Sequence, residues 1–240
     1  MSPTVTSDIV DSLAPSGKLR VAINLGNMVL AQGTSDSPRG ITVDIARELA
    51  GRLGVPVEFS CFDQAGKAFE GFRANNLDIA FLAIEPVRAA EIEFTAPYVI
   101  IEGIYMVLKD SPLKKIEDVD AKDVRIAVAK DAAYDLFLTR SLTNATLARG
   151  PESFERLSRG EVEAAAGVKQ PVVAYARAHP EVRIIDGRFM EIRQAMGTQK
   201  GREAGSRYLS VFIEDLKASG FIADGLRRSN QPEATVAPPA

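Results

Sequence analysis

Three stretches near the start of the chain decide the fold class: LRVAINL at 19–25, GITVDIARELAGRLG at 40–54 and VEFSCF at 57–62. The first and third are short apolar runs, which are typical of buried strands. In the second, apolar residues recur at the spacing of one helical face, at Ala46, Leu49, Ala50 and Leu53. Thr42 is expected to cap this helix, and Gly54 followed by Pro56 is expected to end it. A helix between two buried strands predicts a parallel α/β sheet.

The same alternation continues along the chain. A helix at 67–76 and a strand at 78–84 complete a first βα set, and an apolar connector follows at 89–108. A second set has expected strands at 124–129, 145–149, 163–168 and 182–185, with helices at 132–142, 152–159 and 171–178. A long helix begins at Arg202 and is broken by Gly220. The pattern predicts an α/β protein of two lobes, each a mostly parallel sheet flanked by helices.

Composition excludes several classes of function. The chain has 240 residues, a net charge of -3 and no basic run, so neither nucleic acid nor an anionic membrane is an expected partner. His179 and Cys61 are the only residues of their kinds, which leaves no zinc cluster and argues against a Ser-His-Asp or Cys-His catalytic set. No metal or cofactor is expected. Cys61 is expected to be a buried small hydrophobe, and His179 a surface residue at a helix end.

Neither a membrane span nor a signal peptide is expected. The longest apolar stretch, near 96–108, is interrupted by Pro97, Glu102 and Gly103 and is shorter than the ~20 residues that a spanning helix needs. Residues 1–17 have no basic region and no apolar core. Either a signal was removed from the chain, or the protein stays in the cytoplasm. Residues 1–17 and 230–240 are expected to be loose tails.

Six landmarks in this order resemble the family 3 solute-binding proteins of ABC importers, from about Lys18 to Ser229: LRVAIN (19–24), GITVDIARELAGRLG (40–54), NLDIAF (76–81), PVRAAEIEFTAPY (86–98), VRIAVAKDAAYDLFL (124–138) and EAAAGVKQPVVAYA (163–176). The resemblance implies the type 2 periplasmic-binding-protein fold. Lobe one would comprise 18–104 and 194–229, lobe two 105–193, and two crossing strands would form a hinge near 105–107 and 193–195.

The resemblance also implies a function. The protein would be a monomer that captures a small polar, carboxylate-bearing ligand in a cleft between its lobes. It would deliver this ligand to an ABC transporter permease. By resemblance its location is periplasmic.

Arg88 is the first candidate for ligand binding. It follows the end of the third strand, where ligands of parallel sheets gather, and its guanidinium holds a carboxylate through two parallel bonds. In the family this Arg grips the ligand's carboxylate. The alternative is a solvated surface Arg paired with Glu91 or Glu93.

The other candidates carry alternatives of the same kind. Asn24 and Asn27 either line the cleft or serve the turn beside Gly26. Asp131 either caps its helix or faces the cleft, where it would favour an ammonium group. Asp63 is expected to be a helix cap, beside residues whose backbone N–H groups could face a ligand. With Arg88, the predicted ligand-binding residues are Glu85, Asn24, Asn27, Gln64, Ala83, Asp131, Ala132, Tyr134 and Lys169.

The sequence departs from the family in its ligand clamp. Residues 78–88 are about two residues shorter than the usual form, and Glu85 stands where the family often has Thr. The family's acidic residue for the ligand's amino group falls at Val168 or Lys169, and neither is acidic. An ordinary α-amino acid in the usual pose is therefore not expected. Either Glu85 and Asp131 replace the missing acid, or Arg88 and Lys169 favour a dicarboxylate or keto acid.

Two other functions stay open at this stage. One is an enzyme on the same scaffold, of the cyclohexadienyl dehydratase kind, for which Glu85 is the candidate acid. The other is a cytoplasmic ligand sensor without a transporter. Fold alone does not separate them.

Overall fold

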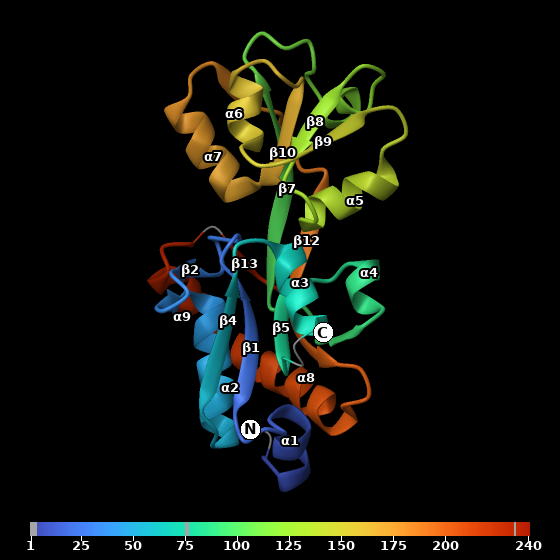
Figure 1. The fold of residues 1–240 in the computed structure, drawn as a ribbon. Helices are drawn as coiled ribbons and strands as arrows, with labels where there is room; N and C mark the ends of the chain where they lie inside the picture. Colours follow the sequence, from blue (N-terminus) through green and yellow to red (C-terminus); the bar gives the residue numbers. More distant parts are fainter. Residues whose placement is uncertain (1–3, 75–76, 233) are drawn as a thin grey trace. The chain divides into compact units, whose positions relative to one another are not determined.

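The computed structural model describes residues 4–74, 77–232 and 234–240, and the chain forms two compact units (Figure 1). Unit 1 comprises Met1–Ile100 and Arg193–Ala240, and unit 2 comprises Ile101–Ile192. The chain passes between the units inside two strands, β7 (Val99–Leu108) and β12 (Met190–Gln199). The lobe boundaries predicted after residue 104 and before residue 194 fall in these same strands.

Unit 1 is built on three parallel strands. β1 (Leu19–Asn24) lies between β4 (Val57–Phe62) and β5 (Ile79–Ala83), and β12 pairs antiparallel with β5. Every residue of β5 is buried, as expected of a central strand covered on both faces. The short strands of this unit are β2 (Gln32–Gly33), β3 (Pro38–Arg39), β6 (Ile92–Phe94) and β13 (Thr235–Val236). Its helices are α1 (Ser7–Leu13), α2 (Ile41–Leu53), α3 (Ala65–Ala74), α4 (Pro86–Ala89), α8 (Glu203–Ala218) and α9 (Phe221–Arg228).

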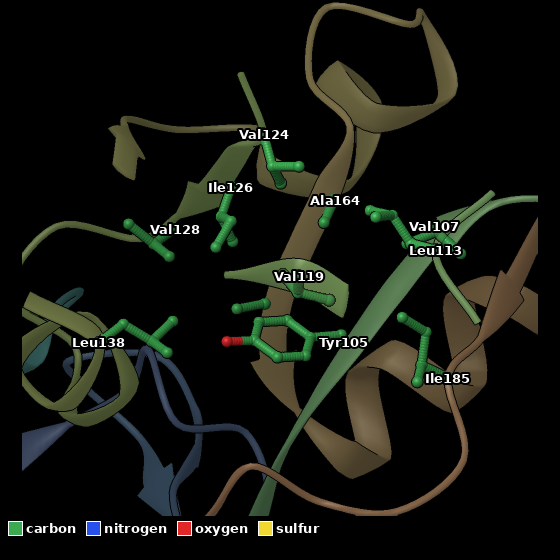
Figure 2. Packing of buried hydrophobic residues seen from close by; sticks show 11 residues of the cluster. Tyr105, Val107, Leu113, Val119, Val124, Ile126, Val128, Leu138, Ala164 and Ile185 are labelled. Atoms are coloured by element: carbon green, nitrogen blue, oxygen red, sulfur yellow. The ribbon is translucent and has the colours of Figure 1, made fainter. Parts of the chain in front are cut away.

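Unit 2 repeats this plan on a smaller scale. β8 (Arg125–Val128) lies parallel to both β9 (Thr146–Arg149) and β10 (Ala164–Val168), and β10 pairs antiparallel with β7. β11 (Val182–Ile184) pairs with β7, and the helices are α5 (Ala133–Ser141), α6 (Ser153–Ser158), α7 (Lys169–Ala178) and the 3-10 helix η1 (Ile116–Val119). Figure 2 shows the apolar core around Tyr105, a cluster that includes Val119, Ile126 and Leu138. The predicted sheets are joined, because β12 also pairs with β7 in the strand order β4-β1-β5-β12-β7-β10-β8-β9.

The start of α2 differs from the prediction. Gly40, with φ of 108°, is the residue before the helix, and Thr42 lies inside it. A Cβ at position 40 would lie 2.6 Å from the Leu30 carbonyl oxygen, so this close approach requires glycine. The Thr42 hydroxyl instead lies 3.2 Å from the Tyr98 hydroxyl, in the interior of unit 1.

The prediction of loose tails was wrong. α1 packs against α8, where the Gly205 amide donates to the Ser12 hydroxyl at 3.1 Å and Leu13 is fully buried. At the other end, β13 pairs antiparallel with the start of β7. The polar composition of both ends concealed the few apolar residues that dock them. α9 was also not predicted, and the last two positions of the helix predicted at 67–76 lie outside the described residues.

A buried carboxylate holds the start of β5. Asp78 is fully buried, and its carboxylate accepts two 3.0 Å hydrogen bonds from the Arg20 side chain and one from Arg202. The Arg20 backbone amide donates another at 3.0 Å. Such a group stabilises the fold only while its partners stay in place.

We therefore expect Asp78→Asn to lower the free energy of unfolding by about 2–4 kcal/mol, since it leaves two guanidiniums partly buried and uncompensated. Denaturant unfolding measures this. Glu58→Gln, which breaks the exposed pair with Lys18, is the control and should cost less than about 1 kcal/mol. Equal effects of the two substitutions would contradict the structural role of Asp78.

Candidate functional site

The carboxyl ends of the three parallel strands in unit 1 bring three loops to one edge of the sheet. β1 ends at Asn24, β4 at Phe62 and β5 at Ala83, and β1 pairs with both neighbours. Open α/β sheets bind their ligands at this edge. Each of the loops carries at least one of the predicted residues.

Arg88 lies in α4, a short helix that Pro86 begins, and not in an open loop. Its side chain is 1% exposed, and Nη1 donates to the Ala83 carbonyl oxygen at 3.3 Å. Glu91, the partner expected for a surface arginine, pairs instead with Arg73 at 2.8 Å. Arg88 is therefore a buried cation at the end of β5, and the reading as a solvated surface residue was wrong.

Glu85 is the residue before α4 and is 2% exposed. Its carbonyl oxygen accepts the amides of Arg88 at 2.9 Å and Ala89 at 2.8 Å. Neither the Glu85 nor the Arg88 side chain is without a partner. The buried Glu85 carboxylate and the buried Arg88 guanidinium therefore belong to residues three positions apart, at the start of α4.

The loop after β1 holds two asparagines in different states. The Asn24 side chain accepts the Gly26 amide at 3.1 Å, so it serves the turn. The Asn27 side-chain oxygen is buried and accepts no hydrogen bond from the described residues. Most buried polar atoms have a partner, so this acceptor is a candidate to receive a hydrogen bond from a ligand or from a water molecule.

The loop before α3 contributes backbone and surface groups. Gln64 is exposed, and its carbonyl oxygen accepts the Ala68 amide at 3.0 Å at the start of the helix. Asp63 had been expected to cap the helix. Its carboxylate instead forms an exposed ion pair with Lys67 at 2.8 Å.

In unit 2, Asp131 is exposed, with a left-handed φ of 58°, and Ala132 is the residue that caps α5. The carboxylate that serves this turn belongs to Asp135, which accepts the Asp131 amide at 2.9 Å. Asp135 is 1% exposed and is paired with Arg149 at 2.9 Å. The predicted capping role of Asp131 was therefore wrong, because the residue four positions later fills it.

Tyr134 packs against the core of unit 2. Burial raises the pKa of its hydroxyl to about 12, and a hydrogen bond with the Ala129 backbone opposes that shift. The side chain therefore has a structural role in the core.

Lys169 belongs to a network of ion pairs in unit 2. Its ammonium lies 2.6 Å from the Glu102 carboxylate, which also takes Arg188 at 2.8 Å, and Arg188 continues to Glu191 at 2.7 Å. Hydrogen bonds from Lys169 and Arg188 lower the pKa of Glu102, against the opposing effect of burial. Lys169, Glu102 and Arg188 line a pocket of about 410 Å³ in unit 2, together with apolar residues that include Ile104 and Val173. The charge of Lys169 is thus balanced within its own unit.

Sequence reasoning missed Glu102 and Asp135. Glu102 lies 67 positions from Lys169, and no local pattern connects them. Asp135 was predictable from the sequence, because an acid in the first turn of a helix commonly binds the free amides there.

Cys61 and His179 are the only cysteine and the only histidine in the sequence. Cys61 is half-buried, less than expected, and burial raises the pKa of its thiol. His179 ends α7 and is partly buried, with its ring stacked on Tyr175 at 3.7 Å between centroids. Within residues 4–74, 77–232 and 234–240, no three His, Cys, Asp or Glu side chains are grouped to hold a metal ion. No helix in the described part of the chain is long and apolar enough to cross a membrane.

This chain is similar in sequence and in structure to known amino-acid-binding proteins. The amino-acid-binding protein AabA of Dichelobacter nodosus is 23% identical over 208 residues, which cover 83% of this chain and 81% of that protein. An amino acid ABC transporter substrate-binding protein, AbpA of Streptococcus pneumoniae, has a solved structure with L-arginine bound. It superposes with a TM-score of 0.76 at 19% identity and covers 92% of this chain and 98% of that one. The ancestral amino acid-binding protein AncCDT-1, a precursor of cyclohexadienyl dehydratase, gives a TM-score of 0.73 at 23% identity, with 91% and 98% covered. At these identities the structural likeness establishes the fold.

Two α/β units joined by two crossing strands, with polar groups at the strand ends, define a solute-binding protein of the type 2 periplasmic-binding-protein fold. Residues 19–228 match the model of the bacterial extracellular solute-binding proteins, family 3, and the chain belongs to that family. The resemblance read from the sequence is confirmed. Members of the family bind small molecules and work with ABC transporters.

The raised pKa of Tyr134 has a consequence for stability. A hydroxyl that ionises at about 12 in the fold and about 10 when unfolded loses its contribution as the pH rises between these values. We expect the destabilisation caused by Tyr134→Phe to shrink as the pH rises from about 9 to 12, because the variant has no hydroxyl to ionise. Denaturant unfolding of both proteins at several pH values measures this. A constant difference would contradict burial of the hydroxyl.

Proposed function

We propose that this chain captures a zwitterionic amino acid or a close relative for an ABC importer, and that Arg88 binds the ligand's carboxylate. The observation that carries the proposal is a buried guanidinium at the end of β5. A desolvated guanidinium binds a carboxylate far more strongly than a solvated one, and its planar fork fixes the orientation of the ligand.

The ligand's ammonium group is proposed to donate to the Asn27 side-chain oxygen. This oxygen is buried without a donor among the described residues, on the loop after the strand next to β5. It would replace the acid that the family carries near Val168 and Lys169, and so the amino group would be rotated from the family's usual pose. Asp131 of unit 2 is a second proposed contact for a cationic group, with Ala132 beside it.

Charge balance favours a zwitterion over a dicarboxylate. The dicarboxylate alternative needed an uncompensated Lys169, but Glu102 takes that charge at 2.6 Å. A second ligand carboxylate would then have to displace an existing ion pair, which is costly in a desolvated site.

The same proposal covers the protein's partner, its oligomeric state and its cellular location. The chain is proposed to act as a monomer outside the cytoplasm, with a permease as its partner and with no reaction on the ligand. The dehydratase-like alternative has weaker support. AncCDT-1 is an amino acid-binding protein, and the buried Glu85 side chain already has a partner within this chain.

The first test concerns the carboxylate. We expect Arg88→Lys to weaken binding of the preferred ligand by about 30-fold or more, because a point charge replaces the bidentate fork and truncating buried charge pairs costs about 2–5 kcal/mol. Calorimetry with glutamine, arginine and 2-oxoglutarate measures this, and circular dichroism verifies the fold. Arg73→Lys, on the exposed pair with Glu91, is the matched control. Unchanged affinity in Arg88→Lys would remove Arg88 from the site.

The second test concerns the ammonium. Asn27→Leu keeps the side-chain volume and removes the acceptor. We expect it to weaken binding of glutamine by about 10- to 150-fold, as for a lost hydrogen bond to a charged group. Binding of 2-oxoglutaramate, the keto acid of glutamine, which has no amino group, should be unaffected. Asn24→Leu is the control, because Asn24 already serves its own turn. An equal loss for both ligands would contradict the role proposed for Asn27.

A further inference from the structure

The C-terminal residues 234–238, here called the strap, lie along the beginning of β7. Thr235 pairs with Ile100 and Val236 with Val99, in antiparallel register. The Ala237 amide then donates to the Tyr98 carbonyl oxygen at 3.0 Å. Ala234 and Ala237 are buried and pack into unit 1, whereas Thr235 and Pro238 are exposed.

A buried lysine joins the strap to the chain segment before β7. Lys217 on α8 donates to the Pro238 carbonyl oxygen at 2.8 Å and to the Pro97 carbonyl oxygen at 3.4 Å. Its side chain is 4% exposed. The ammonium is also paired with Glu214 on the same helix, and its hydrogen bonds to the two carbonyl oxygens hold both segments against α8.

The strap begins where β7 leaves unit 1. Its first paired residue, Thr235, lies opposite Ile100, and unit 2 begins at Ile101. The chain passes between the units only in β7 and β12. Any motion of one unit against the other must therefore be absorbed by backbone torsions in these two strands.

We propose that the strap is a restraint on this crossing: it fixes the last unit 1 residues of β7 and so narrows the range of motion between the units. Residues 99 and 100 are paired with the strap, and a strand segment with a hydrogen-bonded neighbour exchanges and bends less than the same segment without it. The relevance of this restraint to ligand capture rests on the proposed function, whereas the restraint itself does not.

The test compares the full chain with a chain ending at Pro232, both without ligand. Hydrogen exchange of the amides at 98–102 should become faster by about tenfold or more when the strap is absent, while exchange in β8 and β10 stays the same. Spin labels on Val211→Cys in unit 1 and Glu117→Cys in unit 2, both exposed positions, report the distances between the units in a Cys61→Ser background. The distance distribution should broaden.

Two variants control for loss of structure. A chain ending at Pro238 keeps the strap and should behave like the full chain. Thr235→Pro keeps all residues and prevents the pairing, so it should behave like the shorter chain. An unchanged distance distribution in both Thr235→Pro and the chain ending at Pro232 would overturn the inference. Since no ligand is present, failure of the proposed function leaves this result unaffected.

Discussion

The whole structure depends on one constraint of chain path: the polypeptide leaves unit 1 in β7 and returns to it in β12. Unit 1 is incomplete until residues 193–240 have come back, since they supply β12 beside β5 and the helices α8 and α9. Tyr98 anchors the point of departure. It is fully buried, its amide donates to the Gln194 carbonyl oxygen at 2.8 Å, and its hydroxyl meets Thr42 at 3.2 Å. Tyr98, in the apolar connector predicted at 89–108, is therefore the anchor of the crossing.

The sequence predicted the elements well wherever local periodicity carries the information. β4 spans the predicted residues 57–62, and the apolar stripe of α2 is buried as expected. Local rules failed where a residue distant in the chain determines the conformation. Thr42 follows a capping pattern, but its hydroxyl lies in the interior beside the Tyr98 hydroxyl. The residue before the helix is Gly40, which the close approach of the Leu30 carbonyl requires. The docked ends of the chain escaped prediction for the same reason, because α8 and β7 hold them.

The candidate site was predictable in its position and less so in its electrostatics. Parallel topology places Asn24, Asn27 and Arg88 at one edge of the sheet, because the carboxyl ends of parallel strands lie together. The burial of Arg88 could not, because a short helix begun by Pro86 replaces the expected loop. The neutralisation of Lys169 depends on a residue of another strand, Glu102. This long-range pairing removes the basis of the dicarboxylate alternative and supports the zwitterion as the proposed ligand.

The central claim is that the native chain binds a small carboxylate-bearing solute and does not transform it. Thermal unfolding against a panel of amino acids, keto acids and polyamines tests it most directly, since a ligand that binds only the folded state must raise its stability. At a ligand concentration 100 times the dissociation constant, the expected stabilisation is about 2.7 kcal/mol, a rise of several degrees for a chain of this size. The account predicts such a shift with at least one amino acid, weaker shifts with the matching keto acid and none with polyamines, and the bound solute should be recovered unchanged. A panel without any shift by a carboxylate-bearing compound, or recovery of a chemically altered solute, would contradict it.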